Sequence, residues 1–422
     1  MSAPSVLVIG AGMYVCGRGT EGVGTILPTL VQAQAEGAVG SISVAVTSQQ
    51  SVRALREKLA LINRTLRAAA SVTAYPARGT DPDAYRAALA EAKPACAIVA
   101  VPDHLHAPIA ADVIAAGAHV LVVKPLTTTR AEAAALISAA RAKPVYGAVE
   151  FHKRWDEANL LLRQAIADGR LGELRHISVE YGQRKSIREA FAPWLRHTSI
   201  FQYLGVHYAD LIYFLTGATP VRVMAVGEPG GAQPWQCDAV QVLIEWKSGK
   251  AGFTSSIVTN WLEPEAASAM SDQRIRVLGT QGRYDSDQKH RGVQLVTDAG
   301  IEDVNPYFSQ AYRSADGRMR IEGYGPRSIR QFVDDVRALS EGRVTLRQLN
   351  EARPTFQEAM VSTAIVEAAN ASLSQGGAWI AVADDASRCR EPDTDVPPDG
   401  RRGRMGMRRD RTRHSRHALV KR

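Results

Sequence analysis

Short, almost uninterrupted apolar runs alternate, over the first 150 residues, with segments in which apolar residues recur every three or four positions. Uninterrupted apolar runs are typical of strands buried on both faces, and the periodic segments are typical of helices packed against them. The predicted strands are 5–10, 41–48, 72–76, 95–102, 119–125 and 144–151. The predicted helices are 25–37, 51–70, 82–92, 106–117 and 129–143. This alternation predicts a parallel sheet in a doubly wound α/β domain, which we place at residues 1–150.

Beyond residue 150 the strands become longer and alternate between apolar and polar positions, which predicts a second α/β domain with a large, mostly antiparallel open sheet. The predicted helices are 156–172, one that runs through Asp210, 328–342 and 355–373. The predicted strands are 173–185, 221–227, 239–246, 251–261 and 273–287. A Ser-Gly-Lys turn at 248–250 favours an antiparallel meander. We place this substrate and oligomerisation domain at 151–380, with the last helix free to return to the first domain.

The composition agrees with two globular domains, because the 422 residues are 45% hydrophobic and 22% charged. No apolar run has the roughly 20 residues of a membrane span, and the N-terminus leads into a strand without the basic segment of a signal peptide. The four cysteines are far apart in sequence, which argues against a disulfide scaffold and a zinc site. We expect a cytoplasmic protein with no metal and no membrane contact.

The net charge of +8 is concentrated in one segment. Residues 400–422 hold ten Lys and Arg and one acidic residue, so the rest of the chain is nearly neutral. We expect the whole Arg-rich segment 384–422 to be disordered, because it offers too little apolar surface to bury. A basic tail binds polyanions without specificity, and we predict no specific nucleic-acid partner.

A Gly-Ala-Gly turn follows the first predicted strand. Glycines here let the backbone turn tightly and approach the pyrophosphate of a dinucleotide, so Gly10 and Gly12 are candidate cofactor-binding residues. The third glycine of the G-x-G-x-x-G pattern is replaced by Val15. We interpret 13–24 as a glycine-rich insertion that displaces the helix start, where Gly22 or Gly24 supplies the missing glycine, and we take Gly24 as the candidate cofactor-binding residue. The alternative is a tight turn that holds no nucleotide.

The segment after the second predicted strand holds no carboxylate, although NAD-selective sites usually place an acid there for the ribose hydroxyls. Ser48 lies in this segment, and Arg53 and Arg56 follow on the next helix, within reach of a 2′-phosphate. We therefore expect NADP(H) to be favoured over NAD(H), with Ser48 and Arg53 as cofactor-binding residues. The alternative is that both arginines are solvated charges on a helix surface.

Three further groups of polar residues are candidates for chemistry. Pro102 and His106 follow a buried strand, and Lys124 ends the next one, where doubly wound domains bind ligands. A lysine held there could hydrogen-bond a substrate hydroxyl or take part in proton transfer. His207 and Asp210 share one face of a later helix, and an imidazole can take a hydroxyl proton near neutral pH.

Taken in order, these motifs resemble those of the glucose–fructose oxidoreductase/inositol dehydrogenase superfamily, often written Gfo/Idh/MocA, across residues 5–380. The similar stretches are VPDHLH, VVKPL, GAVEFHKRW, PWLRH, GVHYADL and IRVLGTQGRYDSD. The resemblance implies an N-terminal Rossmann domain that binds a nicotinamide cofactor. It also implies hydride transfer at a carbinol or keto carbon of a sugar, sugar derivative or cyclitol. Lys124 then matches the catalytic lysine at the cofactor, His207 the catalytic histidine, and Pro102 and His106 the loop on the cofactor side.

Two positions depart from the family pattern. Val123 stands where the family has an acid before the lysine, and Tyr203 where it has an Asp four residues before the histidine. The proton relay must therefore differ. We expect Tyr203 either to shape the site or to act as an acid/base whose pKa is lowered by Lys124. The expected substrate-side residues are Glu150, His152, Arg154, Trp194, Tyr203 and Asp210.

Two other functions stay open from the residues alone. In one, the cofactor is retained and a transient oxidation assists elimination or glycosidic cleavage, with the insertion 13–24 covering the pyrophosphate. In the other, the chain is a non-catalytic sensor of nucleotide or sugar, which the loss of an acid at Tyr203 would suit. Basic residues at 184, 185 and 188 also leave a phosphorylated sugar open as the substrate.

Strands 239–246 and 251–261 carry mostly apolar or small uncharged side chains on both faces. The face that is not packed on helices is therefore an expected contact surface. The resemblance also implies sheet-to-sheet dimers, sometimes paired into tetramers. We predict a homo-oligomer built through 239–259; the rival arrangement is a monomer in which 305–325 covers this face.

Overall fold

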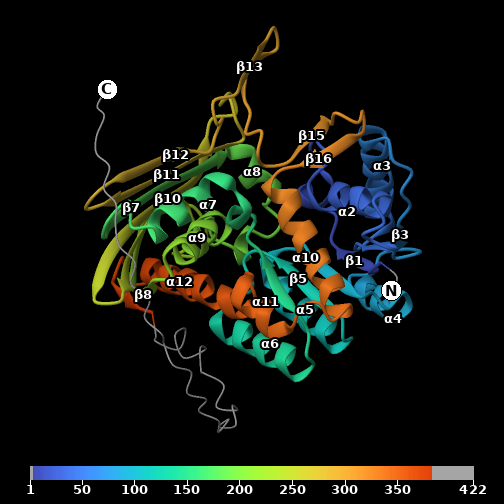
Figure 1. The fold of residues 1–422 in the computed structure, drawn as a ribbon, viewed down its shortest axis with the longest axis horizontal. Coiled ribbons are helices and arrows are strands. Elements are labelled where there is room, and N and C mark those ends of the chain that lie inside the picture. Colours follow the sequence, from blue (N-terminus) through green and yellow to red (C-terminus); the bar gives the residue numbers. More distant parts are fainter. Residues whose placement is uncertain (1–2, 383–422) are drawn as a thin grey trace, which may run out of the picture.

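The computed structural model describes residues 3–382, which form two sheets with helices around them (Figure 1). The segment 384–422, which we expect to be disordered, lies outside the described residues. The first sheet is parallel throughout and has the order β3-β2-β1-β4-β5-β6. Its strands are β1 (Val6–Ile9), β2 (Ile42–Ala45), β3 (Thr73–Tyr75), β4 (Cys96–Val99), β5 (His119–Val123) and β6 (Gly147–Glu150). The predicted doubly wound sheet is confirmed, and its order reverses between β1 and β4, where such folds bind ligands.

Helices cover both faces of this sheet, as the apolar strands require. They are α1 (Met13–Cys16), α2 (Ile26–Ala35), α3 (Gln49–Leu66), α4 (Ala84–Ala92), η1 (Asp103–Leu105), α5 (His106–Ala115) and α6 (Arg130–Ala142). The local sequence determines where two of these helices begin: Ser48 caps α3, and Thr129 with Glu132 forms a capping box at α6. The described cysteines Cys16, Cys96 and Cys237 are buried and unpaired.

The second sheet is mixed but mostly antiparallel, with the order β12-β11-β7-β10-β9-β8-β17. Its strands are β7 (Leu174–Arg184), β8 (Thr219–Pro229), β9 (Cys237–Ser248), β10 (Ala251–Glu263), β11 (Ser271–Gly279), β12 (Arg283–Asp287) and β17 (Ile380–Ala381). The predicted meander holds for β8, β9 and β10 and is wrong beyond them, because β7 pairs in parallel with β10 and separates it from β11. The strand predicted at 273–287 is a hairpin, since the chain turns between Gly279 and Gly282.

The remaining elements lie around the second sheet or pack back on the first domain. They are η2 (His152–Trp155), α7 (Glu157–Ala167), α8 (Lys185–Ala190), η3 (Leu195–His197), the π-helical turn η4 (Phe201–Gly205), α9 (Val206–Thr216), the hairpins β13 (Gln294–Thr297)–β14 (Gly300–Asp303) and β15 (Gln310–Arg313)–β16 (Met319–Glu322), α10 (Tyr324–Ser340), α11 (Leu346–Ala352) and α12 (Phe356–Ser374). Among residues 3–382 no helix is long and apolar enough to cross a membrane.

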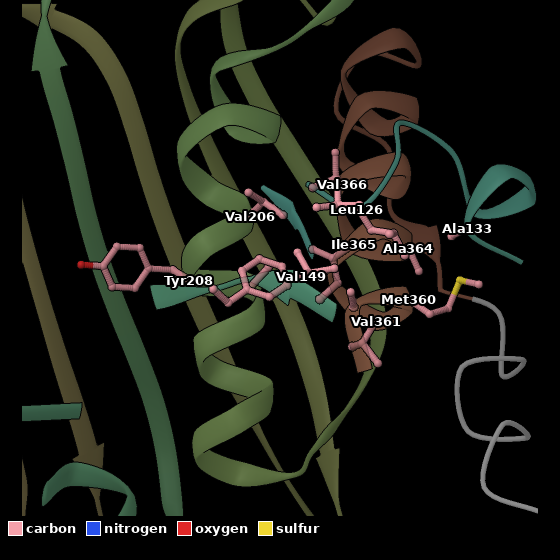
Figure 2. Packing of buried hydrophobic residues seen from close by; sticks show 14 of the residues in the cluster. Leu126, Ala133, Val149, Val206, Tyr208, Met360, Val361, Ala364, Ile365 and Val366 are labelled. Carbon is pink, nitrogen blue, oxygen red and sulfur yellow. The ribbon is translucent and has the colours of Figure 1, made fainter. Parts of the chain in front are cut away.

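The last helices join the two sheets into one core. In Figure 2, Val206 of α9, Val149 of β6 and Ile365 of α12 meet, while Tyr208 leaves the other side of α9 toward the second sheet. Helix α12 packs on α6 and β6 as well as on α9 and β8, and α10 packs on α2. The ends of β5 and β6 are therefore held against α9.

Segment 305–325 does not cover the open face of the second sheet, as the rival monomer arrangement would need. Its hairpin β15–β16 packs on α2 and α3 of the first domain, where the Ile321 amide donates to Gln32 Oε1 at 2.6 Å. The start of this segment turns inward, and Phe308 lies against Tyr324 at the beginning of α10.

Candidate active site

The loops after β4 and β5 are joined by one buried imidazole. His106 is 1% exposed, with Nδ1 2.7 Å from the carbonyl oxygen of Pro125 and Nε2 2.9 Å from that of Val101. Because backbone carbonyls engage both ring nitrogens, His106 fixes the segment that carries Lys124. Contact between His106 and the cofactor stays a prediction. Pro102, half-buried, opens the short helix η1 between them.

Lys124 ends β5 as a buried lysine that makes no ion pair in the described structure. Its Nζ donates to the backbone carbonyl of Tyr203 and lies 4.0 Å from the centroid of the Tyr203 ring. Burial lowers the pKa of Lys124 to about 8, against the opposing charges of Asp103 and Glu150. The side chain is thus a proton donor near neutral pH that gives up its proton far more easily than an ordinary lysine.

Tyr203 lies in the π-helical turn η4, an irregularity often found at functional sites. Its ring meets Phe191 edge-on at 4.7 Å, and Phe191 also contacts the half-buried Trp194 at 4.6 Å. Burial raises the pKa of Tyr203 well above its ordinary value, so the expected lowering by Lys124 is wrong. The ammonium lies over the ring face and on the backbone carbonyl, and desolvation of the phenolate dominates. The geometry favours the shaping role for Tyr203.

His207 follows directly, in the first turn of α9. It is 4% exposed, and its Nδ1 is buried without a hydrogen-bond partner in the described structure. Burial lowers the pKa of His207 well below its ordinary value, and the charges of Lys124, His152 and Lys153 act in the same direction. His207 is therefore a neutral imidazole close to Lys124, which brings the two predicted catalytic residues into one site.

Glu150 and His152 lie beside His207 at the end of β6. The Glu150 carboxylate is 1% exposed and accepts hydrogen bonds from Tyr14 Oη at 2.9 Å and Ser328 Oγ at 2.6 Å. It also lies 3.1 Å from His152 Nδ1, and the rings of His152 and His207 are 4.8 Å apart. Residues from α1, η2 and α10 thus meet around the carboxylate at the end of β6.

Arg154 and Asp210 bind each other. The guanidinium donates to both Asp210 oxygens at 2.9 and 2.6 Å, both side chains are buried, and Glu358 lies 3.6 Å from the same guanidinium. This pair fixes η2 to α9 and α12 behind the site. Substrate contact by Arg154 and Asp210 stays a prediction, as it does for Trp194.

Sequence reasoning missed Tyr14, Ser328 and Lys153. Lys153 is 2% exposed, and its Nζ donates to Gln288 Oε1 at 2.9 Å and to Gln273, with no carboxylate bonded to it. Burial lowers its pKa to about 7. Nothing local distinguishes Lys153 from a surface lysine, since its partners come from strands more than a hundred residues away.

The turn after β1 has the shape that a dinucleotide needs. Gly10 has a φ of +108°, and a Cβ there would lie 2.1 Å from the Ala100 carbonyl oxygen, so only glycine fits. A Cβ at Gly12 would meet nothing within 4 Å, so this side of the turn is open to a ligand. The residues present therefore fit the pyrophosphate of a nicotinamide dinucleotide.

The helix predicted at 25–37 is α2, which begins at Ile26 after the insertion, and a single helical turn, α1, stands before it. Helix α1 begins at Met13, directly after Gly12, and the chain leaves it after one turn to return at α2. Gly24 packs on the end of α1, where a Cβ would lie 2.6 Å from the Gly17 nitrogen. Contact between Gly24 and the cofactor stays a prediction.

The segment 17–24 between α1 and α2, referred to below as the excursion, packs on α3. Lys58 Nζ donates to the carbonyls of Thr20 and Gly22, and Arg18 donates to Ser51 Oγ at 3.1 Å. Ser51 Oγ in turn lies 3.2 Å from Ser48 Oγ, at the end of β2. Arg53 and Arg56 point away from this cluster as exposed residues of α3. Among the described residues no cluster of His, Cys, Asp or Glu could hold a metal ion.

The first domain has a parallel sheet and a glycine turn, and the second, open-sheet domain places a histidine beside a buried lysine. This combination defines a two-domain oxidoreductase. Family models agree: residues 5–151 match the oxidoreductase family with an NAD-binding Rossmann fold, and residues 160–285 match the GFO/IDH/MocA C-terminal domain. The chain belongs to the Gfo/Idh/MocA family, as its motifs indicated.

Named relatives are dehydrogenases. Inositol 2-dehydrogenase of Rhizobium meliloti is 26% identical over a match that covers 52% of this chain and 66% of that protein. The NADP(+)-dependent scyllo-inositol 2-dehydrogenase of Bacillus subtilis is 33% identical over 31% of this chain and 38% of that protein. A structure of scyllo-inositol dehydrogenase from Lactobacillus casei with NAD(H) and scyllo-inositol superposes with a TM-score of 0.60 at 14% identity, covering 90% of this chain and 99% of that one. The structural likeness shows the fold.

Proposed function

We propose that the chain transfers a hydride between a nicotinamide cofactor and the carbinol or keto carbon of a cyclitol, sugar or sugar derivative. The observation that carries the proposal is the pairing of buried Lys124, at the carboxyl end of a strand next to the order reversal, with neutral His207 from the second domain. Relatives named as inositol dehydrogenases support the substrate class.

The residues divide the chemistry between them. A bound nicotinamide supplies the hydride acceptor or donor. Lys124 hydrogen-bonds and polarises the reacting oxygen, and the neutral imidazole of His207 takes the hydroxyl proton as the C–H bond breaks and the carbonyl forms. Reduction runs through the same groups in reverse. Tyr203 and Trp194 shape the substrate side, and His106 keeps Lys124 in place.

The cofactor proposed is NADP(H) in preference to NAD(H). No carboxylate follows β2, and Ser48 Oγ and the Arg18 guanidinium lie together at its end. Arg53, which we expected to bind the phosphate, is exposed on the next turns of α3 and remains a second candidate. The excursion 17–24 packs on α3 and leaves Gly12 open. The alternative of a retained cofactor, in which this segment covers the pyrophosphate, therefore gains no support from the structure.

A substrate panel tests the function. Purified protein is mixed with NADP+ or NAD+ and a set of inositols, aldoses and sugar acids, and reduced nicotinamide is followed by absorbance. We expect turnover of at least one cyclitol or sugar, with a higher kcat/KM for NADP+. Absence of turnover in both directions, with both cofactors, would contradict the proposal.

A further inference from the structure

The proposed function leaves one group of residues without a role: the Glu150 carboxylate and the His152 imidazole that it binds. Neither is held by an ion pair to Lys or Arg in the described structure. Glu150 instead accepts from the hydroxyls of Tyr14 and Ser328 and from His152 Nδ1, so its charge acts on the imidazole. A buried carboxylate bonded to a histidine fixes the tautomer of the ring and stabilises its protonated form.

The other buried carboxylates around Lys124 and His207 are already engaged. Asp103 accepts from Thr198 Oγ1 at 2.8 Å and from Gln202 Nε2 at 2.7 Å, and Asp210 is paired with Arg154. Tyr203 occupies the position at which an acid would stand, and its raised pKa keeps it protonated. Glu150 is thus the carboxylate near the site that reaches an imidazole.

The two imidazoles lie in ring contact, with centroids 4.8 Å apart and planes tilted by 51°. No hydrogen bond joins them in this conformation, and His207 Nδ1 has no partner in the described structure, so a turn of one ring is needed for Nδ1–H to reach His152. Because Glu150 accepts from His152 Nδ1, the lone pair of His152 is on Nε2.

We propose that Glu150 and His152 form the proton relay of this active site: His207 passes the substrate proton to His152 Nε2, and Glu150 is the positioning residue that stabilises the resulting imidazolium. This relay rests on the proposed function. In oxidation, the carbinol C–H bond breaks and its electron pair goes to the nicotinamide. The O–H proton goes to His207 Nε2 while the Nδ1 proton of His207 moves to His152, so the charge ends beside Glu150.

The groups that face His152 support this direction of transfer. Tyr14 of α1 and Tyr324 of α10 face the ring, and burial raises the pKa of each, so both stay neutral. His207 of α9 is held neutral as well, with Lys124 and Lys153 opposing its protonation. Glu150 is the anion among the described groups in contact with the ring, so a proton that leaves His207 is stabilised on His152.

Two readouts test the relay. In ¹H NMR, the Nδ1–H of His152 should give a strongly downfield resonance that disappears in both Glu150→Gln and His152→Gln. In steady-state kinetics of oxidation, Glu150→Gln should lower kcat/KM by about 10²-fold. It should also move the acidic limb of the pH profile to lower pH, because the variant lacks the anion that favours protonation of His152. His152→Gln, at a partly exposed position, serves where the buried Glu150 variant folds poorly.

Ser328→Ala is the matched control, because it removes a donor to the same carboxylate and keeps its charge. It should retain the downfield resonance and not move the acidic limb to lower pH. An unshifted limb and full rate in both Glu150→Gln and His152→Gln, with an active wild type, would overturn the relay and leave the proposed function standing. A ¹⁵N spectrum in which the neutral His152 ring carries its proton on Nε2 would overturn the relay without any activity measurement. A wild type that binds no dinucleotide would instead contradict the proposed function itself.

Discussion

Lys124 is buried and bonded to a carbonyl, and no carboxylate in the described structure forms an ion pair with it. Desolvation is the largest influence on its pKa, which falls to about 8. A packing role explains such a lysine poorly, because a buried ammonium without an anion costs free energy. A group that must hydrogen-bond a reacting oxygen explains it well.

Replacement of Lys124 should show this role. Lys124→Ala should lower kcat/KM by about 10²–10⁴-fold, the usual range for loss of a proton-transfer or polarising group. The wild type should have an alkaline limb near pH 8. Lys124→Arg should keep part of the rate and lose this limb, because a guanidinium stays charged across this range. Full activity in the alanine variant would contradict the assignment.

Lys153 provides a stability test that needs no substrate. Its pKa is about 7 in the folded protein and near 10.4 when unfolded, so the unfolded chain binds more protons between these values. The cost of charging Lys153 is therefore fully present below pH 7 and is relieved as the pH rises. The free energy of unfolding should gain about 2 kcal/mol from this residue between pH 7 and 9.

The control for this gain is Lys153→Met, measured by urea unfolding across the same pH range. The unfolding free energy of the wild type should rise relative to that of the variant as the pH increases from 7 to 9. Parallel pH curves for the two proteins would mean that Lys153 keeps its proton in the folded state throughout pH 7–9, which would contradict the lowered pKa.

At the scale of elements, the excursion between α1 and α2 is the most distinctive feature of the first domain. It brings Arg18 to Ser51 and Ser48 at the end of β2, where the ribose of a dinucleotide is bound in this fold. The guanidinium and hydroxyls together suit a 2′-phosphate.

Arg18→Ala should therefore weaken NADP+ binding about tenfold, as expected for one charge-assisted contact, and leave NAD+ binding unchanged. Isothermal titration with both cofactors measures this. Arg56→Ala, an exposed arginine of α3, is the matched control and should change neither affinity. Equal weakening of both cofactors by the Arg18 variant would indicate a role in the loop alone.

Element periodicity was enough to predict both sheets, because buried parallel strands and amphipathic helices leave clear patterns. The insertion of β7 between β10 and β11 could not be predicted, since pairing partners depend on contacts far apart in sequence. The site divides in the same way. Sequence motifs gave Lys124, at a strand end, and His207, at the start of a helix. Tyr14 and Ser328 are brought to Glu150 only by the packing of α1 and α10.

For the whole molecule, the open face of the second sheet is the largest question. Inward positions of its strands are buried, while Val226, Leu262 and Leu278 on the outward face are 45%, 47% and 37% exposed. Exposed apolar side chains on three strands of this face suit a partner surface. A second copy of the chain, related by two-fold symmetry through 239–259, would cover them.

Light scattering tests this assembly. The wild type should have about twice the chain mass of 45.6 kDa, or four times it for a tetramer. Leu243→Glu on the open face should shift the mass toward the monomer, whereas Leu161→Glu, an exposed position on α7, should not. A wild-type mass near 45.6 kDa at tens of micromolar would refute the oligomer.

Hydride transfer is the central claim, and isotope labelling tests it most directly. A cyclitol or sugar that turns over is deuterated at its carbinol carbons and oxidised with NADP+, and the cofactor is then analysed by mass spectrometry. We predict one deuterium in the nicotinamide ring of each NADPH formed, and loss of this product in Lys124→Ala. Product formation that leaves no deuterium in the cofactor would contradict the account.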